Sequence, residues 1–287
     1  MKTLLRTLAL LVLALACATP AVAKPALWAV RDADTTIYLF GTVHLLPNDT
    51  EWRFPVLERA LAGSDVLYEE IVDDDTVHVQ ALVLRYGLDL DHPLSSLLTA
   101  HEQATLAAAA RTVGLPAGAL QVMRPWLAGL TLAVAPLLKA GLDPAHGVDK
   151  LLRAQMTAAG KPVRGLETAE QQVRLLADMP PSMQLAFLRS TLHDFGEAGP
   201  QLAAIIGAWK DGDVAAIAHS EDAELKQRSP ELYQRLLVAR NVRWARQIAA
   251  MLKRPGTVFV AVGAAHLAGP DSVQAQLGKL GIAAQRL

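Results

Sequence analysis

Two short motifs of the form Gly-x-x-His stand near opposite ends of the chain, and their residues are well suited to chemistry. The first lies in YLFGTVHLLPND, residues 38–49, and ends on His44; the second lies in FVAVGAAHLAGPD, residues 259–271, and ends on His266. Each motif follows an apolar run that is typical of a buried strand. Ligands of open α/β sheets bind beyond the carboxyl ends of the strands, so we expect the two imidazoles to converge there.

A third apolar run, SDVLYEEIVDD, supplies a carboxylate at its end from Glu69 or Glu70. Successive strand residues point to opposite faces, so only one of the two would face the histidines. Two imidazoles and one carboxylate suit a catalytic divalent ion with open coordination positions. The pattern therefore predicts a site at His44, His266 and one glutamate. The alternative is that each histidine is only a structural hydrogen-bonding residue.

Strands at both ends of the chain and helices between them must position these residues. From residue 76 to about 160, Ala- and Leu-rich stretches broken by Gly and Pro predict helices. We therefore predict one α/β (mixed α+β) domain, residues 24–287. Its central sheet is built from N- and C-terminal strands, with a large helical insertion at about 76–160. The predicted strands lie in residues 26–42 (a hairpin turning at 32–34), 64–74, 161–167, 257–267 and 282–287.

The first 23 residues have the composition of a signal peptide. Lys2 and Arg6 precede an apolar run at 8–16, and AVA at 21–23 matches an A-x-A cleavage site. The apolar run is shorter than the ~20 residues of a membrane-spanning helix. We therefore expect cleavage after residue 23 and export, with a periplasmic location and no membrane span in the mature chain.

Cysteine count and charge exclude several classes of protein. Cys17 is the only cysteine and lies in the segment expected to be removed, which excludes a disulfide framework, a thiolate metal site and a cysteine nucleophile. Without Lys2 and Arg6, the chain has 25 basic and 28 acidic residues, so we expect no nucleic-acid partner. The apolar run at 125–141 contains Pro136 and is too short to span a bilayer, which favours a buried helix.

Several motifs together resemble the TraB/GumN (TraB/PrgY/GumN) family, to which the Tiki metalloproteases are related. They are YLFGTVHLLP, SDVLYEE, GVDKLL, KPVRGLETAEQQ, ARNVRWA and FVAVGAAHLAGPDSV, in the family's order. The resemblance implies an active site of His44, His266 and Glu70. It further implies a divalent ion and a peptide or protein substrate; Mn, Co and Zn all tolerate His/carboxylate sites, so the sequence does not select among them. Glu70 fits the family's pattern of apolar residues before one glutamate and x-Asp, but the longer spacing at 71–73 leaves Glu69 open.

Four further residues in these motifs are candidates for the site. Asp149 in GVD and Glu167 in GLE could be extra ligands or a general base, although Glu167 also precedes a helix cap. Arg240 and Asn241 lie in a long predicted helix and are candidate substrate-binding residues. Arg240 could hold a substrate carboxylate through two hydrogen bonds, or it could pair with Glu70 or Glu167.

Three functions are compatible with these residues. The leading hypothesis is a metal-dependent hydrolase of the cell envelope, in first place a peptidase, whose ion lowers the pKa of a bound water. Glu70 would then be the third ligand or the base. The second hypothesis is a metal-free hydrolase in which a His/Glu pair activates water, as a distant resemblance to erythromycin esterase-like hydrolases implies. The third is a periplasmic peptide-binding or regulatory protein without catalysis.

Overall fold

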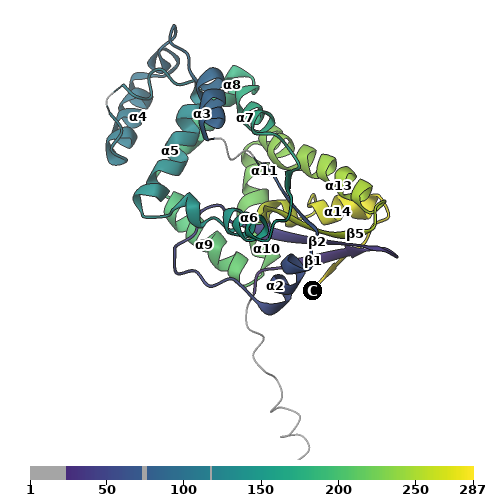
Figure 1. Cartoon of the computed structure of the whole chain (residues 1–287). Helices are drawn as coiled ribbons and strands as arrows, with labels where there is room; N and C mark the ends of the chain where they lie inside the picture. Colours follow the sequence, from purple (N-terminus) through teal and green to yellow (C-terminus); the bar gives the residue numbers. More distant parts are fainter. Residues whose placement is uncertain (1–23, 73–75, 117) are drawn as a thin grey trace, which may run out of the picture.

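One six-stranded sheet, in the order β4-β3-β5-β2-β1-β6, takes five strands from the N- and C-terminal parts of the chain, as predicted, and one, β4, from its middle. The computed structural model describes residues 24–72, 76–116 and 118–287 (Figure 1). The expected signal peptide and its cleavage site lie outside the described residues. The strands are β1 Leu27–Arg31, β2 Thr35–Thr42, β3 Val66–Glu69, β4 Val163–Gly165, β5 Gly256–Gly263 and β6 Ala284–Arg286.

Four neighbouring strands, β4, β3, β5 and β2, run parallel to one another. Their carboxyl ends therefore meet at one edge of the sheet. Thr42 at the end of β2 pairs with Gly263 at the end of β5, and Glu69 at the end of β3 pairs with Ala261. This register brings the ends of three strands from distant parts of the sequence side by side.

β1 and β2 form the predicted hairpin. Asp32 closes the turn, because its Oδ1 accepts hydrogen bonds from the backbone N–H groups of Thr35 (2.8 Å) and Asp34 (3.2 Å). Aspartate favours such turns since its short side chain can bind the backbone two or three residues further on. On its other side β1 pairs with β6, also antiparallel, so the C-terminal strand forms the edge of the sheet.

Helices cover both faces of the central strands, which explains why β2 and β5 are apolar over most of their length. On one face Phe40 packs with Trp209, and on the other Val260 packs with Trp244. All four side chains are almost completely buried. The covering helices are α2 Pro55–Ala62, α6 Val148–Ala158, α9 Ala198–Lys210 and α10 Val214–Ile217 on the first face, and α13 Ala239–Met251 and α14 Val273–Lys279 on the second.

A second group of helices lies away from the sheet (Figure 1). Leu106, Leu132 and Leu188 share its core. The first two belong to the expected insertion at 76–160, but Leu188 comes from the segment between β4 and β5. This helical layer therefore draws on both segments. Its helices are α3 Thr76–Gly87, α4 Ala100–Thr112, α5 Pro125–Lys139, α7 Ala169–Ala177 and α8 Pro181–His193, beside the short α11 Glu224–Arg228 and α12 Pro230–Tyr233.

The apolar run at 125–141 forms α5, a helix as predicted, which is buried over its first half. Trp126 and Leu132 are almost completely buried, whereas Leu138 near the end of the helix is 46% exposed. In the part of the chain that the structure describes, no helix combines the length and apolar character needed to cross a membrane.

The long helix expected before β5 is interrupted by a π-helical turn, which follows α12 and precedes α13. In a π-helical turn the backbone hydrogen bonds join residues five apart instead of four, so the side chains of the following helix point in other directions than in an unbroken α-helix. Arg240 and Asn241 stand in the first turn of α13, and both are buried. The interruption therefore helps to set the direction of these two side chains. This π-helical turn is η4 Gln234–Val238. The other short helices are the 3-10 helices η1 Leu94–Leu97, η2 Pro144–His146 and η5 Ala264–Leu267, and the π-helix η3 Ala218–Ala223.

Candidate active site

His44, Glu70 and His266 converge around Gly263 at the carboxyl edge of the sheet. A β-carbon placed on Gly263 would lie 3.0 Å from Glu70 Oε1, 3.7 Å from His44 Nε2 and 3.6 Å from His266 Cδ2. A side chain at this position would therefore press on the carboxylate, which explains the use of glycine. The structure thus brings together the three residues that the sequence singled out.

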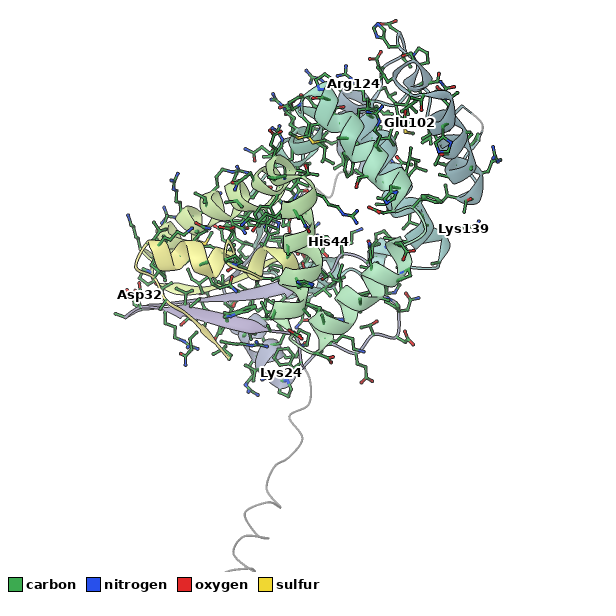
Figure 2. All side chains as sticks on the ribbon, turned by 180° about the vertical axis from the view of Figure 1, so that it is seen from behind. Lys24, Asp32, His44, Glu102, Arg124 and Lys139 are labelled. Atoms are coloured by element: carbon green, nitrogen blue, oxygen red, sulfur yellow. The ribbon has the colours of Figure 1, made fainter. Side chains whose placement is uncertain are left out.

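The two Gly-x-x-His motifs nevertheless place their histidines differently. Gly41 pairs with Val262 and not with Gly263, so the motifs are displaced by one residue in the register. His44 lies in the loop after β2 (Figure 2). Its side chain is 59% exposed. His266 lies in η5, and its side chain is 7% exposed. Solvent and substrate can therefore reach His44 much more easily than His266.

Glu70 is held as an ionised carboxylate. Its Oε1 accepts a hydrogen bond from the Gly263 N–H (2.7 Å), and its Oε2 accepts from Arg240 (2.5 Å) and Gln172 (2.9 Å). Burial raises the pKa of Glu70, but its electrostatic interactions with His266, Arg240 and His44, together with the Gly263 N–H hydrogen bond, outweigh burial and lower the pKa to about 2. Glu70 is therefore charged at any physiological pH.

The structure separates Glu69 from Glu70, between which the sequence left a choice. Glu69 instead accepts a hydrogen bond from Arg153 Nε (2.6 Å). Arg153 is further tied to the backbone oxygen of Ile71. Glu70, and not Glu69, therefore lies with the two histidines.

Arg240 links the two sides of the site. Its Nη2 donates to Glu70 Oε2 (2.5 Å), and its Nε donates to Glu167 Oε2 (3.0 Å). The guanidinium also lies 4.5 Å from the centre of the Trp244 ring. Only 6% of Arg240 is exposed. Of the two roles considered for Arg240, pairing with the glutamates is the one the structure shows; it pairs with both.

Both ring nitrogens of His266 are engaged. Asn241 Nδ2 donates to the Asp271 backbone oxygen (2.9 Å), so its Oδ1 is the acceptor for His266 Nδ1–H (2.6 Å). His266 Nε2 then accepts from Arg240 Nη1 (2.9 Å). Burial lowers the pKa of His266, the charge of Glu70 opposes this, and Arg240 adds to it, giving a pKa of about 3. His266 is therefore neutral, and Asn241, fully buried, orients it.

His44 is oriented by Asp149 in the first turn of α6. The Nδ1 of His44 and the Oδ1 of Asp149 are 3.2 Å apart, so Nε2 is the nitrogen left for chemistry. Burial of the inner edge of the ring lowers the pKa of His44. The hydrogen bond and charge of Asp149, together with the charge of Glu70, outweigh this and raise the pKa to about 9. Because the ring is more than half exposed, solvent screens part of this effect.

A pocket of about 460 Å³ adjoins these residues. We call it the site pocket; its lining includes Thr42, His44, Glu70, Asp149 and Lys150. Its volume lies within the range of small-ligand sites. The buried pair of Arg240 and His266 lies behind Glu70 and does not line the pocket. The site therefore has a reachable part, His44 and Glu70, and a supporting part behind it.

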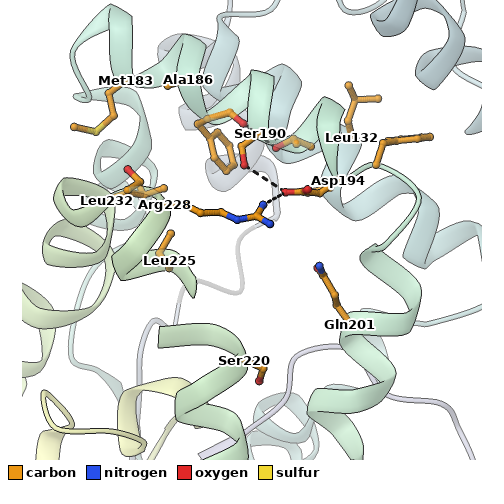
Figure 3. Close-up of a pocket in the computed structure, with 15 residues that line it drawn as sticks. Leu132, Met183, Ala186, Ser190, Asp194, Gln201, Ser220, Leu225, Arg228 and Leu232 are labelled. Atoms are coloured by element: carbon orange, nitrogen blue, oxygen red, sulfur yellow. Dashed lines mark hydrogen bonds and ion pairs between the residues drawn. The ribbon is translucent and has the colours of Figure 1, made fainter. Parts of the chain in front are cut away.

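A second cavity, of about 350 Å³, lies among α5, α8, η3, α11 and α12 (Figure 3). Its walls are largely apolar, with Leu132, Phe187 and Leu232 among them. Asp194 accepts hydrogen bonds there from Ser190 and Arg228. None of the residues that the sequence selected lines this cavity, so the chemistry of the protein is better sought at the sheet edge.

The three expected metal ligands do not fit an ion site in this arrangement. A divalent ion needs a free lone pair on each ligand, and both nitrogens of His266 are already engaged. The Arg240 guanidinium already contacts two of the three expected ligands, His266 and Glu70. Its positive charge would repel a divalent ion at the same place. Within the described ranges, no group of three or more His, Cys, Asp or Glu side chains could hold a metal ion. Metal dependence stays a prediction.

Sequence reasoning missed several residues that belong to the site. Gln172 donates to Glu70 (2.9 Å), and Lys150 and Thr42 line the site pocket. They lie inside the motifs KPVRGLETAEQQ, GVDKLL and YLFGTVHLLP, respectively. Membership of these motifs was the feature of the sequence that could have identified them. Asp149 was a candidate ligand or base, and the structure places it as the partner of His44.

Comparisons with known proteins agree with the motifs. The model of the TraB/PrgY/gumN family matches residues 26–286. The uncharacterized protein YbaP of Escherichia coli K12 is 25% identical over 256 residues, covering 88% of this chain and 92% of YbaP. YbaP of Shigella flexneri is 26% identical over 243 residues, covering 84% and 87%. No solved structure matches the chain.

Proposed function

The chain belongs to the TraB/PrgY/gumN family, and from that premise we propose that it is a hydrolase whose reaction uses His44 and Glu70. The resemblance to the Tiki proteases makes a peptide the first substrate to test. We also propose that the protein works in the cell envelope after export, as its first 23 residues predict.

One observation carries this proposal: His44 Nε2 and Glu70 Oε1 meet at the wall of the site pocket. They lie 3.7 Å and 3.0 Å from the same point above Gly263. His44 has the Asp149 partner that a histidine acting as a general base needs for its orientation. Glu70 Oε1 accepts one hydrogen bond, from Gly263, and keeps a lone pair for a water.

The steps follow from these positions. A water held by a hydrogen bond to Glu70 Oε1 gives a proton to neutral His44 Nε2 while its oxygen attacks the peptide carbonyl carbon. Asp149 and Glu70 stabilise the imidazolium that forms. The imidazolium then returns the proton to the leaving nitrogen as the C–N bond breaks, which gives a carboxylic acid and an amine. Arg240 and His266 are positioning residues, because Arg240 holds Glu70, His266 accepts a hydrogen bond from Arg240, and neither contacts a reacting atom.

The test uses the mature chain, residues 24–287, with a peptide library and mass spectrometry of the products. We expect His44→Ala and Glu70→Gln to lose about 100-fold or more of the activity. His101→Ala, which alters an exposed histidine at the start of α4, is the matched control and should stay active. Unchanged activity in both site variants would refute the proposal. Stoichiometric peptide binding without any product would replace it by a non-catalytic binding function.

Metal dependence needs a second arm of the same experiment. The protein is loaded with Mn, Co or Zn, desalted and examined by elemental analysis beside His44→Ala and His266→Ala. Activity that survives exhaustive chelation supports the steps given above. Near-stoichiometric metal that falls in both variants would instead place an ion at the site and require Arg240 to move off His266.

A further inference from the structure

We propose that the site pocket contains a subsite for one carboxylate group of the substrate, formed by Lys150, the N-terminus of α6 and the Thr42 hydroxyl. This inference rests on the proposed hydrolase function. It adds the substrate class, namely a peptide that carries a carboxylate close to the bond that is cleaved.

Lys150 lines the site pocket and makes no hydrogen bond or ion pair with any residue that the structure describes. Three carboxylates also line the pocket, and each already contacts a basic side chain. The three pairs are Glu69 with Arg153 (2.5 Å), Asp149 with His44 (3.2 Å) and Glu70 with Arg240 (2.5 Å).

The start of α6 adds to the positive potential at Lys150. No side chain caps this 11-residue helix, Val148–Ala158, and an uncapped N-terminus favours an anion. The Val148 N–H donates to the Val43 backbone oxygen (3.0 Å), which ties the helix start to the loop that carries His44. Asp149 and Lys150 both stand in the first turn, and both line the site pocket together with His44.

Thr42 gives an independent sign that a polar ligand belongs here. Thr42 is 2% exposed, and its Oγ1 is buried without a hydrogen-bond partner in the described part of the chain. Buried hydroxyl groups almost always have a partner, so an isolated one calls for an explanation. Thr42 lines the same pocket as Lys150. A substrate oxygen in the pocket would provide the missing partner.

The charge count selects a carboxylate over other anions. One unpaired ammonium matches a monoanion, whereas a phosphate dianion would leave an uncompensated negative charge beside Glu69, Glu70 and Asp149. The carboxylate could be the carboxyl terminus of the peptide or an acidic side chain. Both present the same chemistry to Lys150, so the probes must distinguish them.

The experiment compares three probes: N-acetyl-alanyl-alanine, its C-terminal amide, and N-acetyl-glutamyl-alanine amide. Ligand-observed NMR on the mature chain follows binding and any hydrolysis in the same sample. We expect at least one of the two acids to bind about ten-fold tighter than the neutral amide. Lys150→Met should remove this preference. Whichever acid is preferred identifies a terminal or a side-chain carboxylate.

Lys253→Met is the matched control, because Lys253 is an exposed lysine just before β5, at the opposite end of that strand. It should keep the preference for the acid. Equal binding of all three probes, no binding of any of them, or a preference that survives Lys150→Met would overturn the subsite. Acid-dependent binding without cleavage would support the subsite and refute the hydrolase function. Cleavage with equal affinity for all probes would support the hydrolase function and refute the subsite.

Discussion

At the residue scale, His44 and His266 end the same motif and yet differ in protonation. Asp149 and Glu70 raise the pKa of His44 to about 9 against the effect of burial, and burial together with Arg240 lowers that of His266 to about 3. An imidazole beside carboxylates holds its proton, whereas a buried imidazole beside a guanidinium loses it. Only His44 can therefore exchange a proton with substrate near neutral pH.

The first prediction concerns the pH dependence of hydrolysis. The proposed base is neutral His44, and its pKa is raised above the ordinary value of 6.5, so the base form increases as pH rises towards about 9. We expect kcat/KM to increase over this range. Asp149→Asn removes the hydrogen bond and charge that raise the pKa, so its rising limb should move to lower pH by about one unit or more. The check is a pH–rate profile of both proteins.

The control for this profile is Asp178→Asn, which alters an exposed carboxylate paired with Arg174. Its profile should match that of the parent. A rate that does not change with pH, or an identical midpoint in Asp149→Asn, would show that His44 is not the base.

The second prediction concerns the buried ion pairs of Arg240. Arg240→Met leaves Glu70 and Glu167 buried without this partner, so we expect a loss of about 3–5 kcal/mol in the free energy of unfolding. Arg243→Met removes another partner of Glu167, but the Arg243 side chain is 48% exposed, and the loss should stay below about 1 kcal/mol. Urea unfolding measures both. Equal losses would mean that Arg240 does not hold the site together.

At the element scale, the position of α6 determines whether Asp149 reaches His44. A β-carbon on Gly147 would lie 2.5 Å from the His44 backbone oxygen. The helix start therefore packs against the loop backbone at a distance that only glycine allows. The local sequence GVD thus combines a close approach, a helix start and the partner of the histidine.

The third prediction follows from this contact. Gly147→Ala should push α6 away from the loop and weaken the His44–Asp149 hydrogen bond, lowering kcat/KM by about 10- to 100-fold. Gly207→Ala in α9 is the control, because a β-carbon there meets nothing within 4 Å. It should be neutral or raise the free energy of unfolding by about 0.4–1 kcal/mol. Steady-state kinetics measures kcat/KM of both variants, and urea unfolding measures their free energy of unfolding. Full activity in Gly147→Ala would contradict the role given to α6.

At the scale of the whole molecule, the sheet and the helical layer are linked by helices that contact both. α5 packs against α8 within the layer and against α9, whose Trp209 belongs to the core of the sheet. The layer is built from both segments inserted between strands, so it cannot fold as a continuous piece of chain. We therefore expect one cooperative unfolding transition.

The fourth prediction tests this link. Leu132→Ala removes a completely buried side chain from α5, and we expect a loss of about 2–5 kcal/mol in the free energy of unfolding. Leu138→Ala, in the same helix but 46% exposed, should cost about 0.5 kcal/mol or less. Circular dichroism and tryptophan fluorescence are followed together in urea. Separate transitions in Leu132→Ala would show that the helical layer unfolds independently of the sheet.

The sequence by itself determined the features that depend on neighbours along the chain. The hairpin at Asp32 formed as expected, and so did the helix cap expected after Glu167, where Thr168 and Gln171 exchange hydrogen bonds of 2.9 Å and 3.2 Å. The sheet from both termini was also predictable, since apolar runs mark buried strands and strand ends share an edge. This was enough to bring His44, Glu70 and His266 to one place.

Only the tertiary structure decided what each of these residues can do. The partner of Glu70 is Arg240, 170 positions away, and the partner of His44 is Asp149, 105 positions away. A pKa and a free lone pair depend on charges and donors within a few ångströms, and spacing along the chain does not fix those distances. The sequence therefore selected the residues, and packing determined their charge, their exposure and their roles.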